Sequence, residues 1–512
     1  MAEDAKDIEN TKMHVRDEFV EVLMSSNAVR DSTKGTEPTK KQAKMTKAIE
    51  GRMNRLFEDK LHSKDAKPDD AIALAQSYLH ISQIYSDVVV KEAFSETYLL
   101  RSLKLLEGRE ATRKAILTAM KVLNCLGRIY VHRKDTNKSE LFFEKALTFY
   151  WNYTDRKDSY PAPIDILYVF GIVTKEFQSG YSLDREYMST LSSLLNLHAA
   201  AHTDAQLQRS TKWVTYEHML LRKQVRLIPL TISRIDWALK VATLSYYLSL
   251  NDRFTEARNH LGIAFYMLNK FYRNEYERID GANFSEMKAT LYEQYNATAT
   301  YINWYAVCYG TMLLHTSKNR LLRFEEKDEQ CERKTEFLTT CDQKLPDSLI
   351  FTSINNIEDE FNTWITDKYI VHFNDAEAVF LRLLRCLNEA QTYHDHAINK
   401  DPEMHAKILQ LISYACKYLT CYEENEEKQV SLHSWRLRIL EESRWQLETH
   451  NKTINFKRFS WLEQAITHVT IVDTHLDGLH IYQRSKVDHM LPDINSHIKS
   501  ALSLFKLYLD SV

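Results

Sequence analysis

Apolar residues recur at three- and four-residue spacing along almost the whole chain of 512 residues. This is the period of an amphipathic helix, and the strict alternation of a half-buried strand is nearly absent. The chain holds only 10 Gly and 8 Pro, well below the roughly 7% and 5% of an average protein. Tight turns and glycine-rich phosphate loops need those residues. The sequence therefore predicts an all-α protein of long helices joined by short polar connections.

Breaks in the helical pattern predict four parts. Pro68, followed by Asp69, supplies a helix start before an apolar run, and one unusually long helix is expected near 283–317. The segment 318–345 then mixes charges densely until Pro346. We expect N-terminal helices at 1–66, an N-terminal lobe at 67–280, a long bridging helix with a charged linker at 281–345, and a C-terminal lobe at 346–512.

Two segments carry the pattern of a tetratricopeptide repeat, in which small residues lie where two paired helices cross. Gly or Ala there lets the backbones approach, and large residues fill the adjoining grooves. The separation of the two segments is not a multiple of the usual repeat length, so the repeats are degenerate. A stack of such pairs leaves an elongated surface that binds peptides or helices. The first segment holds Leu123, Leu126, Gly127, Tyr130, Ser139, Phe143 and Ala146, and the second holds Val241, Leu244, Ser245, Leu248, Ala257, Leu261 and Ala264.

Signatures of catalysis and of nucleotide or metal binding are nearly absent. No GxGxxG, GxxxxGK[ST] or GxSxG motif occurs, so we expect no catalytic residue, no cofactor and no small-molecule substrate. His198 and His202 stand one helical turn apart, a spacing that can bind zinc, but Ala199 replaces the glutamate of a metalloprotease. No third ligand is apparent, so two histidines on a partly exposed helix face are favoured over a metal site.

The net charge and the composition of the chain limit which partners and which cellular location we expect. The net charge of −3 gives no global positive field for nucleic acid, and the basic stretch around 34–55 is interpreted as a solvated helix face. No CxxC pair, secretory signal or apolar run of 18 residues occurs. We expect a cytoplasmic monomer that binds neither nucleic acid nor membrane.

One alternative function is that of a general scaffold or co-chaperone that binds peptide tails. Many tetratricopeptide proteins hold the C-terminal carboxylate of heat-shock chaperones with Lys and Asn at set repeat positions. Those positions here are Asn124 and Arg128 in the first repeat, then Ala242 and Tyr246 in the second. Because Ala242 offers no hydrogen-bond donor, a two-carboxylate clamp is not expected.

Three stretches of the chain carry a family likeness. The strongest is IDWALKVATLS at residues 235–245, with Trp237 as its large core residue, followed by a Glu-Ala-Arg opening of the partner helix. The second is KSAL followed shortly by YLDS within 499–511, and the third is the helix pair around Gly127. These stretches resemble the KIF-binding protein family, of which the chain is identified as a divergent member over roughly residues 70–512.

The resemblance implies a concrete fold and function. It implies a right-handed α-solenoid of two lobes joined by a long helix, with a concave face that binds kinesin motor domains. Bound there, the protein would cover the helix through which a motor contacts tubulin, and so block microtubule attachment without any chemistry. The location implied is cytoplasmic and associated with the cytoskeleton.

The family's contact positions on that face match this sequence only in part. Thr243 matches, whereas Ser193 and Asn196 replace an aromatic residue and a Gln, and His218 stands near another Gln position. Asn keeps the amide of Gln with a shorter reach. Ser193 removes a large contact, a loss that can exceed about 1 kcal/mol at an interface. We predict partner binding through these four residues that is weaker than in the family, or directed to other motors.

Overall fold

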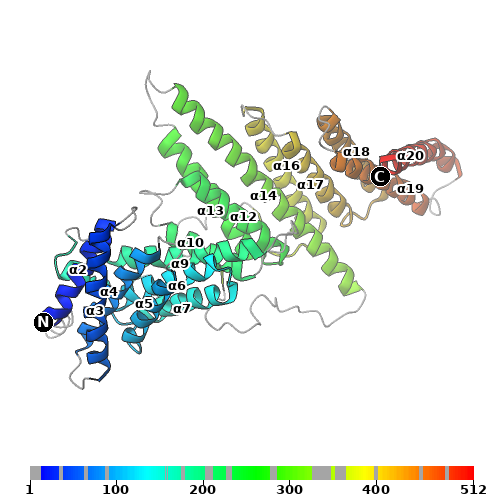
Figure 1. Cartoon of the computed structure of the whole chain (residues 1–512). Coiled ribbons are helices and arrows are strands. Elements are labelled where there is room, and N and C mark those ends of the chain that lie inside the picture. Colours follow the sequence, from blue (N-terminus) through cyan, green and yellow to red (C-terminus); the bar gives the residue numbers. More distant parts are fainter. Residues whose placement is uncertain are drawn as a thin grey trace. The chain divides into compact units, whose positions relative to one another are not determined.

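All regular elements that the structure describes are helices (Figure 1). This computed structural model describes residues 13–33, 39–62, 67–86, 92–155, 157, 159–173, 179–201, 211–225, 233–276, 285–325, 348–351, 365–396, 402–448, 454–478 and 484–511. Within these ranges the predicted all-α array of helix pairs is confirmed, and none of the helices has an apolar stretch long enough to traverse a bilayer. The chain divides into two compact units, Met1–Lys223 and Gln224–Val512.

The first unit stacks its helices in two layers. Helices α2, α4, α6 and α9 are successive neighbours and form one layer, while α3, α5 and α7 each pack against two members of it. The stagger of the two layers is that of a helical-repeat solenoid. The unit contains α2 (Asp17–Thr33), α3 (Lys40–His62), α4 (Pro68–Ser86), α5 (Glu92–Leu106), α6 (Ile116–His132), α7 (Thr136–Thr154), α8 (Ile166–Val169), α9 (Ser179–Ala201) and α10 (Thr211–Gln224).

The pair α6 and α7 is built as its repeat pattern predicts. All seven pattern residues from Leu123 to Ala146 are buried. The turn between the helices uses Lys134 at φ 59°, and the Asp135 carboxylate caps α7 by accepting the Lys138 N–H at 3.1 Å. The Ser139 hydroxyl donates to the Gly127 carbonyl at 3.0 Å. The two helices therefore meet at the predicted small residue.

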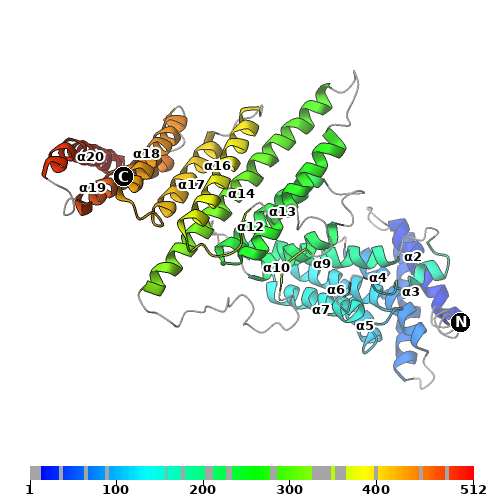
Figure 2. The same cartoon turned by 180° about the vertical axis from the view of Figure 1, so that it is seen from behind.

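The second unit is itself a row of helices. Figures 1 and 2 both show α14, α16, α17 and α18 side by side in chain order. The long helix α14 packs against α12 and α13 on one side and α16 and α17 on the other. The unit contains α12 (Arg234–Leu250), α13 (Phe254–Phe271), the π-helical turn η2 (Tyr272–Tyr276), α14 (Ser285–Glu325), α16 (Phe373–His396), α17 (Pro402–Thr420), α18 (Glu426–Glu448), α19 (Ile454–Gly478) and α20 (Arg484–Ser511).

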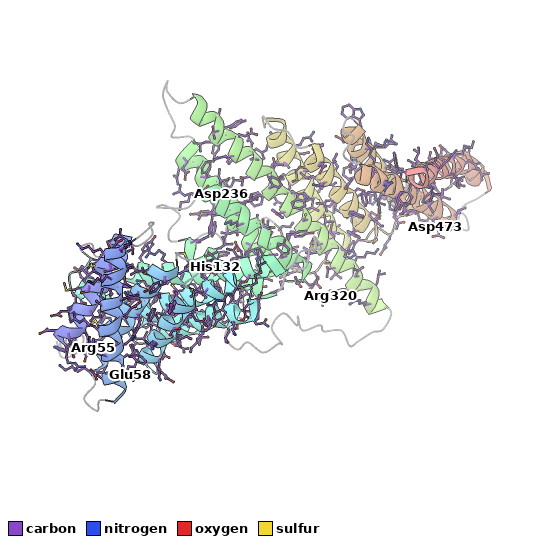
Figure 3. The ribbon with its side chains drawn as sticks, in the orientation of Figure 1. Arg55, Glu58, His132, Asp236, Arg320 and Asp473 are labelled. Carbon is purple, nitrogen blue, oxygen red and sulfur yellow. The ribbon has the colours of Figure 1, made fainter. Side chains whose placement is uncertain are left out.

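The long helix extends eight residues beyond its predicted end at 317, to Glu325. Figure 3 marks Arg320 near the C-terminal end of this helix. Its guanidinium lies 3.9 Å from the centre of the Tyr369 ring, a cation–π contact that fixes this end of the helix to the segment before α16. Further back, Gly310 faces Leu383 of α16 so closely that a Cβ atom would clash with it. The remainder of the charged segment, 326–345, lies outside the described residues, and the four domain boundaries stay predictions.

The second predicted repeat forms the pair α12 and α13. Its seven pattern residues from Val241 to Ala264 are buried, as is Trp237. The Trp237 ring meets the edge of Phe351 with ring centroids 5.7 Å apart. The Glu256 carboxylate accepts the Leu349 N–H at 3.0 Å, so the segment 348–351 is held against this pair.

Candidate functional site

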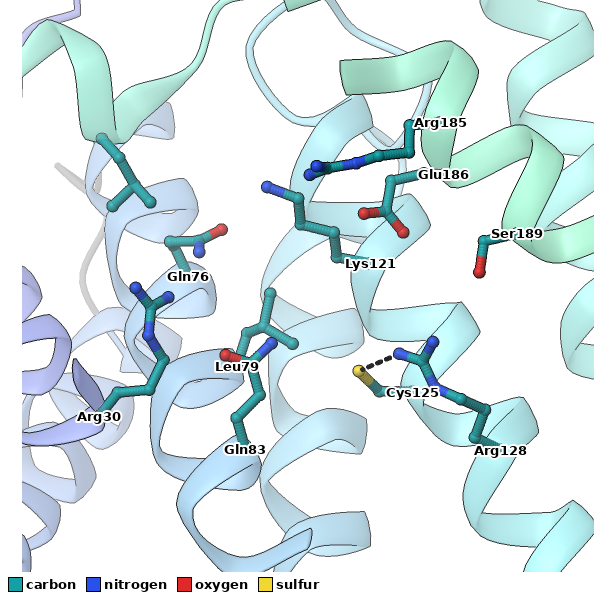
Figure 4. A pocket seen from close by; sticks show the side chains of 11 residues that line it. Arg30, Gln76, Leu79, Gln83, Lys121, Cys125, Arg128, Arg185, Glu186 and Ser189 are labelled. Atoms are coloured by element: carbon teal, nitrogen blue, oxygen red, sulfur yellow. Dashed lines mark hydrogen bonds between the residues drawn. The ribbon is translucent and has the colours of Figure 1, made fainter. Parts of the chain in front are cut away.

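Helices α2, α4, α6 and α9 of the first unit, with Leu167 of α8, line a pocket of about 340 Å³ (Figure 4). Gln76, Leu79 and Gln83 of α4 line it between α2 on one side and α6 with α9 on the other. Because α2, α4, α6 and α9 form a single layer, the pocket is a hollow on one face of the solenoid, where repeat proteins present binding surfaces.

A buried hydrogen-bond chain holds the α4 side of the pocket in place. The Thr118 hydroxyl of α6 donates to Gln76 Oε1 at 2.9 Å, and Gln76 Nε2 lies 2.9 Å from His80 Nε2. His80 Nδ1 lies 3.0 Å from the Ser26 hydroxyl of α2. Burial, with smaller contributions from the Arg30 and Lys121 charges, holds the pKa of His80 well below its usual value. A neutral imidazole is thus one link of a network that joins three helices.

The α6 and α9 side is joined through Asn124. Its amide donates to the Glu186 carbonyl and carboxylate, each at 3.1 Å, and its oxygen accepts the Thr190 hydroxyl at 2.7 Å. Asn124 is fully buried. The residue at the carboxylate-clamp position of the first repeat therefore bonds within the protein. Its amide is not available to bind the carboxylate of a ligand.

The pocket lining is strongly basic. Arg30, Lys121, Arg128 and Arg185 line it, against one carboxylate, that of Glu186. Arg30 pairs with Asp31 at 2.8 Å. Across the part of the chain that the structure describes, Lys121, Arg128 and Arg185 have no carboxylate within 4.0 Å; Arg128 contacts the Cys125 sulfur at 3.2 Å instead. This cluster was not predicted from the sequence, because Arg30, Lys121 with Arg128, and Arg185 stand on three helices far apart in the chain.

The predicted contact residues lie in different surroundings. Ser193 is half-buried, and its hydroxyl donates to the carbonyl of the pocket residue Ser189 at 2.9 Å. Asn196, two turns from Ser189 on the same face of α9, is exposed. His218 of α10 is 1% exposed. Ser193 and Asn196 thus lie beside the pocket in the first unit, and Thr243 belongs to the second unit.

Thr243 lies at the edge of an aromatic cluster in the second unit. Its hydroxyl donates to the Leu239 carbonyl at 2.9 Å and shares a hydrogen bond with the Tyr305 hydroxyl of α14 at 3.0 Å. The Trp304 ring centre lies 4.8 Å from that of Tyr305 and 6.0 Å from that of Tyr246. These three aromatic side chains are half-buried. Partly exposed aromatic residues of this kind are enriched at protein interfaces.

The described residues contain no group of three or more His, Cys, Asp or Glu placed to hold a metal ion. The side chain of His198 and all of His202 lie outside the described residues. The structure therefore does not test whether these two histidines bind zinc. The surroundings that the structure does describe are suited to binding another protein: a basic hollow in the first unit and an aromatic cluster in the second.

The family model described as KIF-1 binding protein C terminal matches residues 235–512, more than half of the chain. The chain belongs to the KIF-binding protein family. A zebrafish (Danio rerio) KIF-binding protein is 24% identical over 99% of this chain and 80% of its own length. The Drosophila melanogaster protein is 25% identical over 82% of this chain and 67% of its own length. Trp237 and Thr243 lie within the match to the KIF-binding family model.

The fold agrees with that of a solved family structure. A structure of kinesin binding protein superposes with a TM-score of 0.50 at 15% identity and covers 96% of this chain and 82% of the solved one. At that identity the agreement shows a shared fold. The resemblance seen in the sequence is thus confirmed at the level of the family and of the helical array.

Proposed function

We propose that this chain binds kinesin motor domains and keeps them from attaching to microtubules. The observation that carries the proposal is the family match over residues 235–512, which begins at the helix that presents Thr243. The relatives are named for binding KIF proteins, and a solved relative for binding kinesin. The protein would act as a non-catalytic monomer in the cytoplasm, in association with the cytoskeleton.

The mechanism we propose is steric exclusion. A motor domain contacts its track through a helix, and helical-repeat surfaces bind helices in their grooves. A motor helix held against the solenoid cannot contact tubulin at the same time. The aromatic cluster beside Thr243 supplies rigid apolar contact area, and Asn196 supplies an exposed amide, the two kinds of contact that anchor interfaces.

Asn196 offers the sharper test of this assignment. Because its side chain is exposed, Asn196→Arg changes the surface of α9 without disturbing the core. Asn152 on α7 is also exposed, so Asn152→Arg is a matched control. We expect motor-domain affinity, measured with purified domains, to fall about fivefold or more for Asn196→Arg and to stay unchanged for Asn152→Arg. Equal affinities for both variants and the unmodified protein would remove Asn196 from the contact surface.

Thr243 needs a gentler substitution because its hydroxyl bonds to Tyr305. Thr243→Val keeps the side-chain shape and removes the hydroxyl, so a lower motor affinity with unchanged helical circular dichroism would support a role of the Thr243–Tyr305 pair in the interface, and an unchanged affinity would contradict it. Ser193 and His218 complete the proposed set. Since His218 is buried, its expected role is to support the surface and not to touch the motor.

The alternative, a scaffold that binds peptide tails, makes a different prediction. The Asn124 amide that a carboxylate clamp would use is bonded to Glu186 and Thr190, which counts against that role. A pull-down with chaperone C-terminal peptides beside kinesin motor domains separates the two functions. Retention of the peptides without the motors would favour the scaffold.

A further inference from the structure

We propose that the basic pocket between α2, α4, α6 and α9 is a docking site for an acidic segment of a partner protein. The site lies wholly within the first unit and contains none of the residues assigned to motor binding. It therefore goes beyond the proposed function and can be tested apart from it.

The charge of the pocket is the first argument. Four cationic side chains line it with a single carboxylate, that of Glu186, and Arg30 is in addition paired with Asp31. Lys121, Arg128 and Arg185 have no carboxylate within 4.0 Å in the ranges that the structure describes. Like charges gathered around one hollow repel one another. An anionic ligand placed among them would be attracted by several cations at once.

The arrangement of the cations favours a polypeptide over a single small anion. Arg30 comes from α2, Lys121 from α6 and Arg185 from α9, and α4 lies between α2 and α6. Packed helices stand roughly 8–10 Å apart, so one oxyanion does not reach all of these cations. Several carboxylates spaced along an extended or helical segment match that spread.

The pocket lining also predicts that the partner segment carries an apolar side chain between its acidic residues. Leu79 of α4 and Leu167 of α8 are part of the pocket wall. The volume of about 340 Å³ admits only a few side chains, at the low end of ligand pockets. The expected partner segment is thus short, with Asp or Glu on both sides of one aliphatic residue.

The test uses the full chain and a fluorescein-labelled peptide with two Glu on each side of a central Leu. A peptide with Lys in place of every Glu is the probe control. Fluorescence anisotropy is expected to show saturable binding of the acidic peptide alone, weakening as NaCl is raised, since salt screens the charges. No binding of the acidic peptide, or equal binding of both peptides, overturns the proposal.

Charge reversal assigns the binding to the pocket. Lys121→Glu combined with Arg185→Glu is expected to lower the affinity for the acidic peptide about tenfold or more, because each change removes an attraction and adds a repulsion. Lys104 and Arg109, exposed outside the pocket lining, supply a matched control with the same net charge change. Equal weakening by both pairs would assign the effect to net charge and contradict the pocket.

Two further measurements separate loss of the site from misfolding, and a peptide ligand from a small anion. Lys121→Gln with Arg185→Gln, a milder pair, is expected to give a smaller loss in the same direction with unchanged circular dichroism, and no loss from this folded pair rejects the site. Inorganic tripolyphosphate is the competitor. If it binds as tightly as the peptide and with the same dependence on Lys121 and Arg185, the pocket takes small phosphates and the peptide proposal is wrong.

Discussion

Gly127 of α6 and Phe143 of α7 lie so close that a Cβ atom added to Gly127 would stand 2.5 Å from the Phe143 ring. Phe143 is fully buried, and Ser139 bonds the Gly127 carbonyl next to it. A glycine inside a helix costs roughly 1 kcal/mol relative to alanine. That cost is offset here because only glycine allows α6 and α7 to approach this closely.

Gly127→Ala should therefore destabilise the protein although alanine is the better helix former. We expect the free energy of unfolding in urea to fall by about 1–3 kcal/mol, the usual cost of overpacking a core. Gly51 on α3 has nothing within 4 Å of its added Cβ, so Gly51→Ala is the control and should be neutral or stabilising. A stabilising effect at both positions would show that the α6–α7 crossing is not limited by Phe143.

A second prediction concerns the ion pair of Arg436 in α18 with Glu463 in α19. Arg436 is 1% exposed, forms a salt bridge with Glu463, and its Nε donates to the Ser413 hydroxyl of α17 at 3.1 Å. Arg436→Met leaves a buried carboxylate without its partner, so we expect a loss of about 3–5 kcal/mol in unfolding free energy.

The double variant Arg436→Met with Glu463→Gln separates charge from packing. Because it removes the unpaired charge, it should be more stable than Arg436→Met alone. The exposed pair of Arg52 with Glu21, 2.7 Å apart, is the control, and Arg52→Met should change stability by less than about 1 kcal/mol. A double variant no better than the single one would mean that the loss comes from packing.

The third prediction is a loss of stability in acid that involves α19 and α20. His468 Nδ1 and His497 Nδ1 lie 2.7 Å apart between these helices. Burial lowers the pKa of His468 to about 4 and that of His497 below its ordinary value, with nearby imidazoles adding to both shifts and Asp493 opposing the second. The unfolded chain, with ordinary His pKa values near 6.5, then binds protons first as the pH falls.

Stability linked to this pair is thus fully present above about pH 6.5 and is lost as the pH falls toward 4. Other buried histidines such as His260 and His433, whose pKa values burial also lowers to about 4, contribute to the same trend. Hydrogen exchange of α19 and α20 at pH 7.5 and 5 isolates the local part. Lower protection at pH 5, measured as the exchange rate relative to the intrinsic rate at the same pH, that His468→Gln restores supports the prediction, and an unchanged pH response in that variant contradicts it.

The sequence predicted the helix pairs because their determinants are local. Gly127 with Ala146, and Ser245 with Ala264, stand at fixed offsets that mark where two helices of a pair cross, and crossing helices require small residues. The long helix was also predictable from its unbroken period, but its end at Glu325 was not, because a charged continuation has the composition of a linker.

The basic pocket was not predictable, for a physical reason. Arg30, Lys121 and Arg185 stand on separate helices, and each alone has the appearance of an ordinary solvated cation. Only the stacking of α2, α4, α6 and α9 brings them to one hollow. The clamp position Asn124 shows the reverse case: the sequence marked it as a possible ligand contact, and the fold uses it to join α6 to α9.

Microtubule co-sedimentation measures whether this protein holds kinesin motor domains away from their track. Motor domains from several kinesin classes are spun with microtubules and a non-hydrolysable nucleotide, with and without excess full-length protein. We expect at least one motor to move from the pellet to the supernatant and to remain there bound to the protein. The proposal is contradicted if all motors stay in the pellet, or if the motors and the protein sediment together with the microtubules.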